Sequence, residues 1–180
     1  MRKQILIGIG IALLIFLGYT LYQYLNPASP PDTVTYEKNG LSIEVDYSRP
    51  YKKDRLIFGP ESEGALQPYG QYWRTGANAA TTITFNQDVV FGGETVPAGS
   101  YSLYTIPGEG NWTIALNSEY DRQGASPPDE ANDVVRLTVP SETFDEVQEQ
   151  FLIDFEEQGP TTFLVLRWDQ IKVSIPIRAA

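Results

Sequence analysis

The hydrophobic positions of this chain change their pattern after residue 31. From Gln4 to Pro31 there are 28 residues without a charged side chain, and 21 of them, Ile5 to Leu25, are predominantly apolar. As a helix, those 21 residues would be about 31 Å long, which matches the core of a bilayer. Arg2 and Lys3 precede them, and such basic residues stay on the cytoplasmic side. The pattern predicts a single-pass transmembrane helix with its N-terminus inside.

A cleavable signal peptide is the alternative, but its apolar core usually has about 7–15 residues and ends at an A-x-A-like site. Here the apolar run is longer, and the positions two before Ala28 and Ser29 are Asn26 and Pro27. We therefore expect an uncleaved signal-anchor in the cytoplasmic (inner) membrane, with the C-terminal domain in the periplasm or outside. The expected parts are a short cytoplasmic end at 1–4, the anchor at 5–25, a Pro-rich spacer at 26–32 and one extracytoplasmic domain at 33–180.

Beyond the spacer, apolar and polar residues alternate with a period of two, the pattern of half-buried strands. The clearest case is Leu41 to Tyr47, which follows the turn-forming pair Asn39-Gly40. Similar short runs recur between Gly, Pro and Asn residues. Strands are expected at 33–37, 41–47, 81–85, 89–91, 100–106, 112–117, 134–139, 163–168 and 171–177.

Two details of this pattern concern the C-terminal part. Thr143 and Glu146 fit a capping box that would start a short helix through Gln150, although the apolar residues there also suit a strand, which we favour toward the end of the segment. The last two strands are separated by Asp169-Gln170, which predicts a terminal hairpin. About nine or ten short strands with little helix predict an all-β domain, an antiparallel β-sandwich rather than a barrel.

Charge and composition then exclude several functions. Eleven basic residues follow the apolar segment, against all 23 acidic ones, so the outer part carries a net charge of −12. This argues against nucleic acid and anionic lipid as partners, because both favour a positive surface. The absence of Cys excludes disulfides and thiol chemistry, and the absence of His excludes Ser-His-Asp triads and the common zinc hydrolases. We expect no cofactor and no metal.

Several strings in the outer part resemble the bacterial family known as domain of unknown function 2911. The strings are YSRP at 47–50, Arg55 with IFG at 57–59, PYGQYWRTGANAATTITF at 68–85, VPAGSYSLYTIPGEGNWTIALN at 96–117 and LRWDQIKVSIPI at 166–177. They cover nearly the whole outer domain. The resemblance implies an envelope or secreted protein, and it implies no activity because the family has none established.

Residues 68–78 combine aromatic rings, glycines and one guanidinium group, as binding loops for sugars, carboxylates or peptide ends do. Two further arginines precede this segment and would add positive charge for an anionic ligand. The candidate ligand-binding residues are Tyr69, Trp73, Arg74, Asn78, Arg49 and Arg55. In the commoner role of such residues, Trp73 would fill the core, Arg74 would pair with an acid and Asn78 would satisfy a turn.

The acidic residues do not form a recognisable site. Asp129, Glu130 and Asp133 offer oxygen ligands, but their spacing matches no EF-hand, and a solvated loop is the simpler interpretation. We assign no catalytic residue. The sequence therefore predicts a membrane-anchored domain of unknown function that binds a small anionic or carbohydrate ligand, or an envelope protein, without catalysis. The alternatives are a carboxylate-based hydrolase acting on envelope carbohydrate and a structural envelope component.

Overall fold

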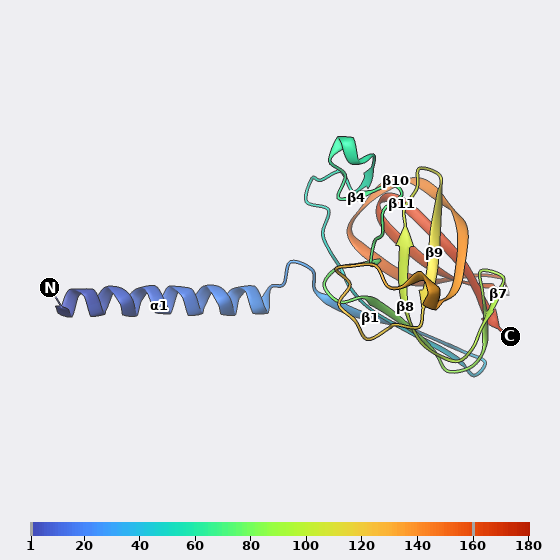
Figure 1. The fold of residues 1–180 in the computed structure, drawn as a ribbon, viewed down its shortest axis with the longest axis horizontal. Helices are drawn as coiled ribbons and strands as arrows, with labels where there is room; N and C mark the ends of the chain where they lie inside the picture. Colours follow the sequence, from blue (N-terminus) through green and yellow to red (C-terminus); the bar gives the residue numbers. More distant parts are fainter. Residues whose placement is uncertain (1, 160) are drawn as a thin grey trace.

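The computed structural model describes residues 2–159 and 161–180, with side chains described except at 2–7, 23 and 24. Helix α1 (Arg2–Leu25) extends away from the remaining chain (Figure 1). The described large apolar side chains between Ile9 and Leu25 are all more than half exposed. The predicted span at 5–25 includes side chains outside the described set, and among the described residues no helix has the length and apolarity needed to cross a membrane. The span stays a prediction.

The rest of the chain is mostly antiparallel β-structure, as predicted. Its strands are β1 (Pro31–Lys38), β2 (Leu41–Ser48), β3 (Phe58–Gly59), β4 (Gln67–Pro68), β5 (Thr81–Phe85), β6 (Val89–Phe91), β7 (Glu94–Val96), β8 (Gly99–Ile106), β9 (Asn111–Asn117), β10 (Asp133–Gln158) and β11 (Thr161–Ala179). Two 3₁₀ turns, η1 (Glu61–Glu63) and η2 (Glu130–Asn132), lie in the loops. The spacer is shorter than predicted, because Pro31 and Asp32 already pair with Ser48 and Tyr47.

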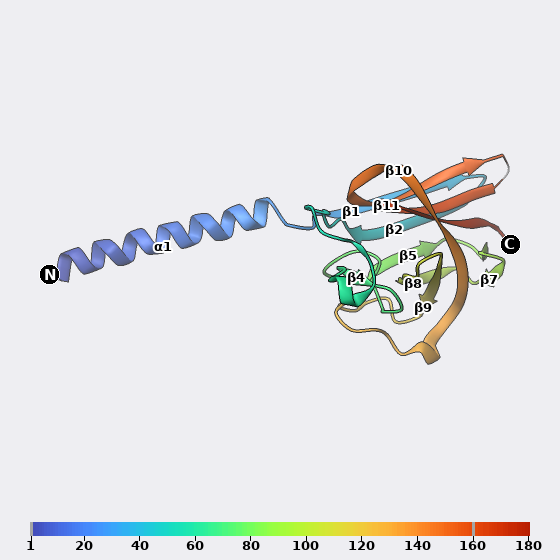
Figure 2. The same cartoon turned by 90° about the horizontal axis from the view of Figure 1, so that it is seen from above.

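One continuous sheet has the strand order β1-β2-β5-β8-β9-β10-β11-β6-β7 among the described residues, and β3 and β4 form a separate parallel pair. Strand β10 joins the two halves of the sheet, because it pairs with β9 through its first part and with β11 through its second. The sheet curls into a sandwich-like arrangement, with β5, β8 and β9 on one side and β10 with β11 on the other (Figure 2).

Of the two alternatives for 143–150, a short helix and a strand, the structure has the strand, because the segment is part of β10, where Thr143 pairs with Ile171. The expected terminal hairpin is wrong. The runs at 163–168 and 171–177 do not form a hairpin, because both belong to the single strand β11. Asp169 has a positive φ of 55° and marks an irregularity that shifts the inward-facing positions by one residue. A phase shift within one strand thus resembles a turn in the sequence.

The core lies between the two sides of the curled sheet and includes an aromatic cluster near the end that faces α1. Trp73 stacks on Trp168 with ring centroids 5.7 Å apart, and Phe58, Trp112 and Phe151 pack around them edge-on or tilted. These side chains come from five distant parts of the sequence. Two of them, Trp73 and Trp168, also line a pocket.

Candidate ligand-binding pocket

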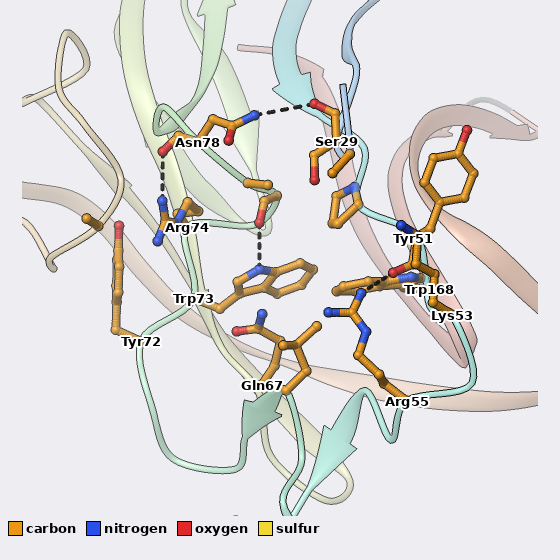
Figure 3. Close-up of a pocket in the computed structure, with 16 residues that line it drawn as sticks. Ser29, Tyr51, Lys53, Arg55, Gln67, Tyr72, Trp73, Arg74, Asn78 and Trp168 are labelled. Atoms are coloured by element: carbon orange, nitrogen blue, oxygen red, sulfur yellow. Dashed lines mark hydrogen bonds between the residues drawn. The ribbon is translucent and has the colours of Figure 1, made fainter. Parts of the chain in front are cut away.

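A cavity of about 510 Å³ opens above this aromatic cluster. One wall comes from Trp73, Arg74 and Asn78, and the opposite wall from the loop that carries Lys53 and Arg55 (Figure 3). The spacer after α1, the loop around residue 125 and strand β11 complete the lining through Ala28, Ser29, Ala125 and Trp168. The pocket thus gathers side chains that lie more than 100 residues apart.

Four of the six candidate residues line this pocket: Arg55, Trp73, Arg74 and Asn78. Tyr69 and Arg49 are outside the lining. The Arg49 guanidinium group pairs with Asp32 at 3.1 Å and donates to the Phe151 carbonyl at 3.1 Å. Tyr69 is partly buried against the core, and this burial is the first cause that raises the pKa of its hydroxyl. Arg49 and Tyr69 therefore take part in contacts within the domain and not in the pocket.

Trp73 belongs to the core and to the pocket wall at the same time. Its side chain is buried, and its indole Nε1 donates to the Gly76 carbonyl at 3.0 Å. Trp168 stacks on it and is only 1% exposed, yet its Nε1 has no hydrogen-bond partner in the structure. A buried polar group without a partner is rare, because leaving it unpaired costs about 1–3 kcal/mol. Trp168 thus lines the pocket and also has a buried hydrogen-bond donor without a partner among the described residues.

Arg74 does not pair with an acid. Its NH1 donates to the Asn78 carbonyl at 2.7 Å, and its stem lies against Gly124, where an added Cβ would come within 2.7 Å of Arg74 Cδ. Asn78 has a positive φ of 63°, which Asn tolerates better than most residues. Its Nδ2 lies 3.3 Å from the Ser29 carbonyl and so connects the spacer to this wall. Apart from NH1, the Arg74 guanidinium group has donors that no acceptor among the described residues uses.

The opposite wall is a tight turn at residues 51–55. Arg55 Nε donates to the Lys52 carbonyl at 2.9 Å, and its NH2 donates to the Tyr51 carbonyl, so the guanidinium group holds the turn together. Lys53 has a positive φ of 49°, and its backbone N–H donates to Glu149 Oε1 at 2.9 Å, while its ammonium group makes no ion pair. Both side chains are exposed toward solvent.

Most of the described basic residues form ion pairs, and the basic residues that line the pocket do not. Of the eleven basic residues after α1, seven pair with an acid: Lys38, Arg49, Lys52, Arg122, Arg136, Arg167 and Lys172. Among the described residues, Lys53, Arg55, Arg74 and Arg178 have no ion pair within 4.0 Å. Three of these four line the same pocket, whose lining in the described part of the chain includes no Asp or Glu.

The acidic loop at 129–133 has an internal role. The Asp133 carboxylate accepts from the Tyr104 hydroxyl at 2.7 Å, from Arg136 NH1 at 3.1 Å and from Asn117 Nδ2 at 2.8 Å. Burial and the hydrogen bond to Asp133 raise the pKa of Tyr104. Within the described ranges, no group of three His, Cys, Asp or Glu residues is arranged to hold a metal ion.

The sequence did not indicate Lys53, Gln67 and Trp168 as pocket residues, and Tyr72 lies in the candidate segment 68–78 but was not among the six candidates. Lys53 lies between the two arginines already singled out, so its position in the same loop was an available signal. Trp168 carries no such signal, because it lies in an ordinary strand pattern and reaches the pocket only through the pairing of β11 with β10.

Comparison with known proteins gives one match. A family model described as "Protein of unknown function (DUF2911)" matches residues 29–177. No curated protein and no solved structure matches the chain. The matched range begins at Ser29 and includes both walls of the pocket.

Proposed function

The chain belongs to this family of proteins of unknown function, and from that premise we propose that its β-domain is a binding module that holds a small anion in the pocket and performs no catalysis. One observation supports the proposal: of the four described basic side chains that have no ion pair, three line one cavity of a protein with net charge −10. Leaving cations unpaired beside 23 carboxylates favours an anionic ligand, because charged hydrogen bonds to a carboxylate or phosphate are strong.

The experiment is a titration of the full-length protein with inorganic phosphate, followed by tryptophan fluorescence. Two of the three tryptophans, Trp73 and Trp168, line the pocket, so an occupied site changes their emission. Removing Lys53 or Arg74 by substitution with Ala should weaken binding about tenfold or more, since each charged hydrogen bond contributes about 1.5–3 kcal/mol.

Arg178→Ala is the matched control, because Arg178 also has no ion pair but is outside the pocket lining. It should bind phosphate as the wild type does, and all variants should keep the wild-type melting temperature within a few degrees. Absence of saturable binding in the wild type, or equal affinity in all four proteins, would overturn the proposal.

The alternative of a carboxylate-based hydrolase finds less support. Such an enzyme needs two carboxyl groups about 5–10 Å apart across a cleft, and none of the described lining residues is acidic. A purely structural envelope component would need no cavity with unpaired cations. A carbohydrate ligand is compatible with Trp73 and Gln67, and anionic sugars would satisfy both the charge and the aromatic wall.

We further propose that α1 tethers the domain to the cytoplasmic membrane, with the domain in the periplasm or outside. The support comes from the uncharged segment at 4–31, from the basic pair before it and from the exposed apolar side chains described on α1. Helix α1 also extends away from the β-domain (Figure 1). Leu14→Arg would place a charge near the middle of the helix, at a cost of about 2.5–3.5 kcal/mol. Alkaline carbonate should then release the variant from membranes but leave the wild type bound; release of both would contradict the tether.

A further inference from the structure

The pocket opens on the side of the domain to which α1 is attached. Ala28 and Ser29 line it, and they follow the last helical residue, Leu25, by only three and four positions. An extended chain of that length covers about 10–14 Å. The contact of Asn78 with the Ser29 carbonyl and the bond from Arg49 N to the Pro30 carbonyl at 2.9 Å fasten this stretch to the domain.

The loop between residues 51 and 68 lies on that same side in both views of the fold (Figures 1 and 2). It carries two of the large exposed apolar side chains of the domain, Leu56 at 41% and Leu66 at 37% exposure. Leu66 N donates to the Leu56 carbonyl at 2.9 Å, and Leu66 lines the pocket together with Lys53 and Arg55. Cations in a cavity whose lining includes an exposed leucine suit an amphiphile with an anionic head.

We infer that the anion in this pocket is the phosphate of an acidic phospholipid, taken from the membrane in which α1 is anchored. The inference rests on the proposed function and names the source of its ligand. Lys53, Arg55 and Arg74 contact the headgroup phosphate, and Leu66 contacts the glycerol and first acyl carbons.

The net charge of the outer part argues against binding to an anionic membrane surface, but it does not oppose the entry of a single acidic lipid into the local cluster of three cations. With −12 on the outer part, the domain is repelled by an anionic membrane surface as a whole, because such surfaces attract basic segments. Only a lipid that enters the local cation cluster escapes this repulsion. Binding should therefore saturate at one lipid per protein instead of growing with the charge of the surface.

The test uses the full-length protein in micelles of a nonionic detergent, with fluorescence of Trp73 and Trp168 as the readout. Three probes distinguish the sources of phosphate: phosphatidylglycerol, phosphatidylcholine with the same acyl chains, and water-soluble glycerol phosphate. We expect a saturable change with phosphatidylglycerol, an affinity at least about tenfold lower for phosphatidylcholine, and weak competition by glycerol phosphate, because the free anion lacks the apolar contacts.

Two variants separate the head from the tail of the ligand. Arg74→Ala should lose affinity for phosphatidylglycerol and glycerol phosphate alike, whereas Leu66→Gln should lose affinity only for the lipid. Val147→Gln is the matched control, because Val147 is also an exposed apolar residue, at 53%, and lies on β10 outside the pocket lining.

The outcomes are distinct. If glycerol phosphate binds as tightly as phosphatidylglycerol, or if Leu66→Gln changes nothing, a soluble anion is the ligand: the lipid inference fails and the proposed function stands. If none of the probes changes the fluorescence in a way that depends on Arg74, both fail.

Discussion

At the scale of single residues, the position of Arg74 depends on a glycine in a distant loop. Gly124 lies against the Arg74 stem, and its backbone N–H donates to the Asn78 carbonyl at 3.3 Å, the same carbonyl that accepts from Arg74. A Cβ at residue 124 would lie 2.9 Å from Arg74 Cβ and 3.1 Å from Ala80 N. The polar loop that carries Gly124 thus contacts the pocket wall through this glycine, which has no side chain.

We therefore predict that Gly124→Ala displaces the Arg74 side chain and lowers phosphate affinity about three- to tenfold, with a loss of stability of about 1–3 kcal/mol from overpacking. Gly110→Ala is the control, because nothing lies within 4 Å of its added Cβ. Calorimetric titration with phosphate and thermal unfolding of both variants check this. Wild-type affinity in Gly124→Ala would show that the position of Arg74 does not matter for binding.

At the scale of elements, the second part of β10 pairs with β11 on one side, and the end of β2 with the segment that follows it covers its other side. The Tyr47 hydroxyl accepts from Ile153 N at 3.1 Å and donates to the Ile153 carbonyl at 3.2 Å, so one side chain satisfies both backbone groups of an edge residue. The bond from Arg49 Nε to the Phe151 carbonyl continues this contact. Arg49 thus belongs to the closure of the sheet.

Tyr47→Phe should destabilise the fold by about 1–3 kcal/mol, because it leaves the buried N–H and carbonyl groups of Ile153 without partners. The control is Tyr101→Phe, which removes a hydroxyl bonded only to the Pro97 carbonyl in a surface turn. Urea unfolding of both variants measures the difference. Equal stability losses would argue against a special role for the contact between Tyr47 and Ile153.

At the scale of the whole molecule, buried phenols make the fold sensitive to alkali. Burial raises the pKa of Tyr47 to about 12, from an ordinary value of 10.0, and Tyr72 and Tyr104 also have pKa values raised by burial first. Between pH 10 and 12 the unfolded chain has released these protons while the folded protein retains them, so unfolding becomes more favourable as pH rises.

We predict that the raised pKa values of these tyrosines do not affect the free energy of unfolding below pH 10. Above pH 10, the free energy of unfolding should fall as the pH rises through 12. Tyr47→Phe should reduce the slope, since it removes one of the protons involved. Unfolding in urea at several pH values, with phenolate absorbance recorded in parallel, tests this. Ionisation of all tyrosines near pH 10 in a folded protein would contradict it.

The sequence by itself determined the class of fold, because alternation with a period of two depends only on which face of each strand is buried. It also indicated four lining residues, since Trp73, Arg74 and Asn78 lie in one short segment and Arg55 precedes that segment as a further source of positive charge. It divided the last strand into two strands with a turn between them, because the local pattern around Asp169 is the same for a bulge as for a turn.

Only the tertiary structure decided which cations are left without an acid. Arg49 and Arg74 look alike in the sequence, but Arg49 meets Asp32 across the β1–β2 pair, whereas Arg74 faces a cavity. Trp168 reaches that cavity from the last strand, through a long-range pairing that no local pattern encodes. Ion pairs and cavities depend on contacts between distant segments, and those contacts are fixed by the packing of the whole sheet.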